Sequence, residues 1–84
     1  MSEQPIKMYS TTWCGDCHRA KRVFDDLGAP YDNINIETEP GAFVDMMQLN
    51  GGRQSVPTIL FPDGSILVEP SNTELIRHLA DRAA

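Results

Sequence analysis

Two cysteines in the segment WCGDCH, Cys14 and Cys17, are the residues whose type and spacing most directly suggest chemistry in this sequence. A C-x-x-C pair followed by a histidine, here His18, is the spacing of a c-type haem attachment site. The same pair between a strand and a helix is typical of a dithiol that cycles to a disulfide. The helices and strands predicted around the cysteines distinguish a haem-binding electron carrier from a redox-active dithiol that needs no cofactor.

The periodicity of apolar side chains places both cysteines at a junction between a strand and a helix. Alternation over residues 6–10 predicts a strand. Apolar residues then recur at spacings of three and four over residues 14–27, which predicts a helix ending at Gly28. Cys14 therefore falls at the start of the helix, and Cys17 lies one turn further along the same face.

The rest of the chain predicts two more helices and three more strands. A capping box, Ser71-x-x-Glu74, announces the last helix. The strands are expected at residues 31–36, 58–61 and about 65–68, with the last two joined by an Asp-Gly turn, and the middle helix is expected to begin near Pro40. The order β-α-β-α-β-β-α predicts an α/β fold with a thioredoxin-like layout, in which a mixed four-stranded sheet carries helices on both faces.

Length, composition and charge limit the class of protein. The chain has 84 residues and a formal charge of −5, so we expect a single domain over residues 1–84 that binds no nucleic acid. Its first ten residues lack the basic and apolar regions of a signal peptide, and no apolar run is long enough to span a bilayer. We expect a monomeric cytoplasmic protein without membrane partners, in which a disulfide is transient and catalytic rather than structural.

These expectations favour the dithiol over haem or zinc. Haem of the c-type is normally attached outside the cytoplasm, so His18 is expected to be a solvent-facing helix residue. A structural or catalytic zinc ion needs at least three protein ligands, and beyond the cysteines only His18 and His78 remain. We expect His78 to be a solvated surface residue, and we expect no metal site.

The helix start would activate the first cysteine. Unpaired backbone N–H groups and the positive end of the helix dipole face this position and favour a thiolate. The pKa of Cys14 is therefore expected to lie below the free value of about 8.5. Cys14 is predicted to attack a disulfide, and the more buried Cys17 to resolve the product.

Pro57 directly precedes an apolar strand, where a residue without an N–H belongs at the strand's first position. In thioredoxin-like folds this position holds a cis-proline packed against the dithiol, and a cis bond usually marks a functional turn. The backbone of Val56 is then expected to pair with an extended thiol substrate.

The chain resembles the glutaredoxins, and most closely the actinobacterial mycoredoxins. The stretches that carry the resemblance are IKMYSTTWCGDC, YDNINIE, NGGRQSVPTILFPDGS and EPSNTEL. The resemblance implies a thiol-disulfide oxidoreductase that reduces protein disulfides, or mixed disulfides with a small thiol, through Cys14 and Cys17. It implies a cis peptide at Val56-Pro57 and no tightly bound cofactor. Electrons would come from glutathione, mycothiol or a flavin-dependent disulfide reductase.

The chain departs from the common glutaredoxin pattern at two places. Gly15-Asp16 replaces Pro-Tyr between the cysteines, and VEPSNTE lacks a glycine pair that binds glutathione. The second departure favours mycothiol as the co-substrate. The Asp16 carboxylate is expected to oppose ionisation of Cys14, and so to raise its pKa relative to a Pro-Tyr variant.

Other residues are expected to contact the substrate. Arg53 is expected to bind an anionic thiol, and Trp13 to cover the disulfide as part of a docking surface. Two alternative functions remain open from the residues. One is an electron donor to ribonucleotide reductase fed by thioredoxin reductase. The other is a carrier of a [2Fe–2S] cluster shared by two chains through Cys14 and two small thiols.

Overall fold

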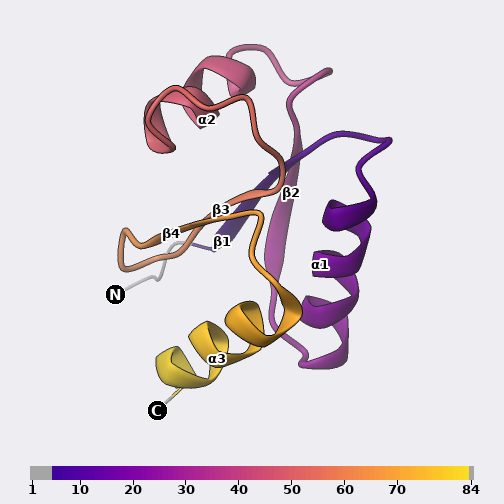
Figure 1. The fold of residues 1–84 in the computed structure, drawn as a ribbon, viewed down its shortest axis with the longest axis vertical. Coiled ribbons are helices and arrows are strands. Elements are labelled where there is room, and N and C mark those ends of the chain that lie inside the picture. The colour runs from indigo at the N-terminus through magenta and orange to yellow at the C-terminus, as the bar shows by residue number, and fades with distance from the viewer. Residues whose placement is uncertain (1–4, 84) are drawn as a thin grey trace.

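The computed structural model describes residues 5–83 of the chain. Its elements follow the order predicted from the sequence (Figure 1). They are β1 (Ile6–Ser10), α1 (Gly15–Asp26), β2 (Tyr31–Asn35), α2 (Ala42–Leu49), β3 (Thr58–Leu60), β4 (Ile66–Val68) and α3 (Asn72–Ala83). Within residues 5–83, no helix is both long and apolar enough to span a membrane.

The strands form a mixed four-stranded sheet in the order β2-β1-β3-β4. β1 runs parallel to β2, with Ser10 opposite Asn35, and antiparallel to β3, with Tyr9 opposite Thr58. β4 closes the other edge as an antiparallel hairpin with β3. The predicted thioredoxin-like fold is confirmed, and β1 lies inside the sheet with a partner on each edge.

Helices cover both faces of this sheet, as predicted. α1 and α3 pack on one face and α2 on the other (Figure 1). There is one hydrophobic core on each face of the sheet. Side chains of β1 pack alternately into the two cores, because successive residues of a strand point to opposite faces. Met8 contributes to the core beneath α1 and α3, whereas Tyr9 packs with Ala42 and Met46 of α2. β1 is therefore fixed from both faces as well as from both edges.

The start of α2 differs from the prediction. The helix begins at Ala42, two residues after Pro40, and follows Gly41, which lies in the left-handed region with φ 80°. The N–H of Ala42 bonds the carbonyl of Glu39, which places Pro40 inside a turn. A residue with positive φ cannot belong to a right-handed helix, so the helix starts only after Gly41. Glycine adopts this conformation at no steric cost.

The last helix carries the predicted capping box. The N–H of Glu74 donates to Ser71 Oγ at 3.1 Å, and the N–H of Ser71 donates to Glu74 Oε1 at 3.0 Å. His78, on the same helix, is not the solvated residue expected from the sequence. Its ring packs against Phe61 at a centroid distance of 4.2 Å, and its Nε2 lies 2.8 Å from Ser65 Oγ. His78 thus joins α3 to the β3–β4 hairpin.

Candidate active site

The two cysteines lie where β1 passes into α1, at one end of the sheet. Their sulfurs form a disulfide, with the two Cα atoms 5.2 Å apart. Cys14 is the N-cap residue of α1 and is partly exposed, whereas Cys17 is fully buried on the core side of the helix. An incoming thiol therefore reaches Cys14 before Cys17.

Backbone groups of the first helical turn converge on Cys14. The N–H of Cys17 donates to Cys14 Sγ at 2.9 Å, and the N–H of His18 donates to the carbonyl of Cys14 at 3.2 Å. A sulfur anion formed at this position would accept the same N–H and face the positive end of the helix dipole. The geometry suits a sulfur that ionises, attacks and returns to a disulfide.

Thr12 fixes the loop before the cysteines. His18 Nε2 lies 3.1 Å from the Thr12 carbonyl, and Asn35 Nδ2 donates to Thr12 Oγ1 at 3.0 Å. His18 is exposed, as expected, but its ring holds this loop instead of only facing solvent. Trp13 follows Thr12 and directly precedes Cys14, and its side chain is 89 % exposed, so its ring is not packed in the core.

Asp16, between the cysteines, is paired with a cation. Its carboxylate lies 3.0 Å from the guanidinium of Arg19, which also donates to Asn72 Oδ1 at 2.7 Å. The charge of Arg19 offsets that of Asp16, and its bond to Asn72 joins the start of α1 to the start of α3.

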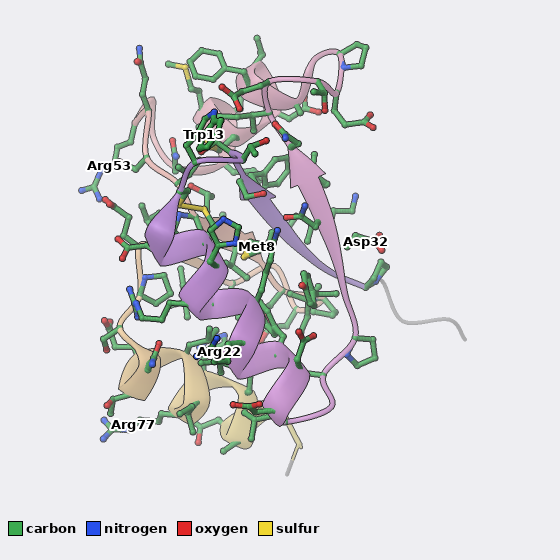
Figure 2. The ribbon with its side chains drawn as sticks, turned by 90° about the vertical axis from the view of Figure 1, so that its right-hand side faces the viewer. Met8, Trp13, Arg22, Asp32, Arg53 and Arg77 are labelled. Atoms are coloured by element: carbon green, nitrogen blue, oxygen red, sulfur yellow. A yellow bond between two sulfur atoms is a disulfide. The ribbon has the colours of Figure 1, made fainter. Side chains whose placement is uncertain are left out.

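The loop before β3 brings further candidate residues to this end of the molecule. The Val56-Pro57 peptide is cis, as the resemblance implied, and Pro57 is buried. In Figure 2 the labelled side chains of Arg53 and Trp13 lie at the same end as the disulfide, which is drawn as a yellow bond. Arg22 lies further along α1, away from that end. Arg53 is exposed, and is therefore accessible to an anionic partner.

Several polar residues around the site are not indicated by the sequence patterns. Asn50 bonds both Arg53 and Thr58, and Asn35 bonds Thr12. An asparagine directly after a helix is a weak signal for a cap, but no spacing pattern reveals its other partners. Within residues 5–83, no three His, Cys, Asp or Glu side chains are arranged to hold a metal ion.

The chain matches proteins of one family over most of its length. Residues 6–66 match the family model described as glutaredoxin. A Mycobacterium tuberculosis relative named as a glutaredoxin is 39 % identical over 70 residues, which cover 83 % of each chain. Mycoredoxin 1 of Corynebacterium glutamicum is 30 % identical over 71 residues, which cover 84 % of this chain and 87 % of the relative.

Solved structures show the same fold. A buckwheat glutaredoxin in complex with glutathione superposes with a TM-score of 0.68 at 28 % identity, over 93 % of this chain and 70 % of the other. The matched regions include β1, the two cysteines and the loop that ends at Pro57. The chain therefore belongs to the glutaredoxin family.

Proposed function

We propose that this protein is a thiol-disulfide oxidoreductase that reduces protein disulfides, or mixed disulfides between a protein and a small thiol. The observation that carries the proposal is the arrangement of the two sulfurs. The accessible Cys14 Sγ accepts the Cys17 N–H at 2.9 Å, while the Cys17 sulfur is buried directly behind it. Proteins of the glutaredoxin family are generally enzymes of this class.

The reaction begins with the reduced dithiol. The Cys14 thiolate attacks one sulfur of the substrate disulfide, and the other substrate sulfur leaves as a thiolate that takes up a proton. Cys17 then loses its proton and attacks Cys14 Sγ, which releases the second substrate thiol. Two electrons pass to the substrate, and the protein is left with the Cys14–Cys17 disulfide.

A small thiol provides a second way to resolve the intermediate. When Cys14 carries the small thiol from a mixed disulfide, a second molecule of that thiol attacks the small thiol's sulfur and frees Cys14 without Cys17. Two molecules of the thiol, or a flavin-dependent disulfide reductase, reduce the Cys14–Cys17 disulfide after the dithiol route. The protein itself needs no tightly bound cofactor in either route.

Mycothiol is the small thiol that the observations favour. A mycoredoxin is among the relatives of this chain, and the segment after the hairpin lacks the glycine pair associated with glutathione. The exposed positive charge of Arg53 does not select between the two thiols, since it would suit the sulfur anion of either one as well as the carboxylates of glutathione. The backbone of Val56 would offer hydrogen bonds to an extended substrate. We propose that the protein acts in this way as a cytoplasmic monomer, with residues 1–84 forming one domain.

A coupled assay with three electron sources tests the proposal. Wild type, Cys14→Ser and Cys17→Ser are each supplied with glutathione and its reductase, mycothiol and its reductase, or thioredoxin reductase. Cys14→Ser should be inactive with every source. Cys17→Ser should keep activity on mixed disulfides with a small thiol, and should lose activity on protein disulfides. Turnover by Cys14→Ser at the wild-type rate, or none by wild type with any source, would overturn the proposal.

A further inference from the structure

Three hydrogen bonds form a continuous chain across the loop that precedes β3. The N–H of Arg53 donates to Asn50 Oδ1 at 2.9 Å, and Asn50 Nδ2 donates to Thr58 Oγ1 at 3.1 Å. The Thr58 hydroxyl donates in turn to the carbonyl of Ser55 at 2.8 Å. A carboxamide and a hydroxyl can each donate and accept hydrogen bonds at the same time. The side chains of Asn50 and Thr58 therefore each accept one hydrogen bond and donate another.

The two side chains belong to the elements on either side of the loop. Asn50 directly follows α2, and Thr58 begins β3, where it pairs with Tyr9 of β1. Thr58 is fully buried, so water cannot replace the partners of its hydroxyl. The loop is thereby tied to the inner strand that leads to the cysteines.

The loop itself has little regular structure to hold it. Gly51 and Gly52 take positive φ values of 76° and 89°, and the following residues up to Val56 belong to no helix or strand. Such a segment has many accessible conformations unless side chains restrict it. Asn50 and Thr58 restrict it at Arg53 and at Ser55.

We propose that Asn50 and Thr58 are positioning residues of the redox site, whose hydrogen bonds hold the Arg53–Val56 segment in the conformation that binds an extended disulfide substrate. The inference rests on the proposed function. The side-chain hydrogen bonds of Asn50 and Thr58 do not involve the reacting sulfurs. The effect should therefore fall on substrate binding and leave the intrinsic reactivity of Cys14 unchanged. A substrate too small to reach the loop should not respond to either residue.

Two variants of Thr58 separate this role from packing. Thr58→Val keeps the shape of the side chain but removes the hydroxyl, whereas Thr58→Ser keeps the hydroxyl and loses only a methyl group. Pre-reduced protein is mixed in single turnovers with two probes. One is a short extended peptide whose cysteine is joined to 2-mercaptoethanol, and the other is bis(2-hydroxyethyl) disulfide.

Thr58→Val should raise the half-saturating peptide concentration about tenfold, because a loop displaced by about 1 Å loses much of its binding geometry. The saturating rate, the rate with bis(2-hydroxyethyl) disulfide and the alkylation of Cys14 by iodoacetamide should stay close to wild type. Thr58→Ser should restore peptide binding. Asn50→Asp, which keeps the acceptor for Arg53 but cannot donate to Thr58, should resemble Thr58→Val and serves if the valine variant does not fold.

Ser65→Ala provides the matched control. Ser65 also takes part in two side-chain hydrogen bonds, to Asp63 and His78, but it lies at the β3–β4 hairpin. This variant should leave both probes unaffected. Equal losses with both probes, or no loss with the peptide in a folded Thr58→Val or Asn50→Asp variant, would overturn the positioning role. Failure of wild type with both probes would instead contradict the proposed function.

Discussion

The guanidinium of Arg19 lies 3.0 Å from the carboxylate of Asp16, the residue directly before Cys17. The two side chains are 38 % and 51 % exposed, so the pair contributes little to folding stability. Its importance lies in the charge near Cys14. The carboxylate disfavours a thiolate, and the guanidinium offsets that effect.

Single variants of this pair should shift the ionisation of Cys14 in opposite directions. Asp16→Asn removes the negative charge, so the midpoint of the thiolate absorbance titration should fall by about half a pH unit after screening by water and salt. Arg19→Gln removes the offsetting charge, so the midpoint should rise by about the same amount. Shifts of the same sign in both variants would contradict the electrostatic account.

Trp13 should matter for large substrates and not for folding. Its side chain is 89 % exposed, so Trp13→Ala should change the free energy of unfolding by no more than about 0.5 kcal/mol in urea denaturation. If the ring is part of the docking surface, the rate with a disulfide-bonded protein should fall severalfold while the rate with bis(2-hydroxyethyl) disulfide is kept. An unchanged rate with the protein substrate would exclude Trp13 from docking.

The capping box of α3 should contribute to stability alone. Ser71→Ala removes the acceptor of the Glu74 N–H and should lower the free energy of unfolding by about 1 kcal/mol. Glu74→Gln is the matched control, because a glutamine side chain can still accept the hydrogen bond from the Ser71 N–H. Urea denaturation of the three proteins tests this. A loss as large in Glu74→Gln as in Ser71→Ala would point to charge and not to capping.

Tyr31 should make the fold sensitive to alkali. Burial, and to a lesser degree the negative charge of Asp25, raise the pKa of Tyr31 above its ordinary value of 10.0. The folded state thus favours the neutral phenol. Its contribution to stability is complete below the unfolded pKa, about 10, and is lost as the pH rises through the higher folded pKa.

Tyr31→Phe removes the titrating group and keeps the ring that stacks on Phe24 at a centroid distance of 4.6 Å. Urea midpoints of wild type and variant should therefore run parallel up to about pH 10, and wild type should lose stability faster above it. Tyr9, whose pKa is raised by burial and by Asp45, is present in both proteins. A constant difference between the two midpoints across this range would show that Tyr31 does not titrate differently on folding.

Local sequence patterns predicted the parts of the fold that depend on neighbouring residues. The order of elements, the position of Cys14 at a helix start and the Ser71–Glu74 capping box all follow from spacings of a few residues. The start of α2 was predicted only to within two residues, because Pro40 suits both a first helical turn and a preceding turn. The left-handed backbone at Gly41 places Pro40 in the preceding turn, and this conformation cannot be recognised from the residue types alone.

Contacts between distant segments could not be predicted in this way. Arg19 and Asn72 are 53 positions apart, and His78 meets Ser65 only after the hairpin folds back onto α3. The bond from Asn50 to Thr58 spans just 8 positions, but it depends on how the intervening loop turns. These contacts are set by tertiary packing, which composition and periodicity do not encode.

The inner position of β1 gives the two sides of the site different mechanical character. Freeing the end of β1 requires its pairing with β2 and β3 to break together, and such local openings are the rarest in a domain. The loop between Asn50 and Thr58 is held by a few side-chain hydrogen bonds and opens more readily. The cysteines therefore follow a rigid strand, whereas adjustment to substrates of different shape falls to this loop.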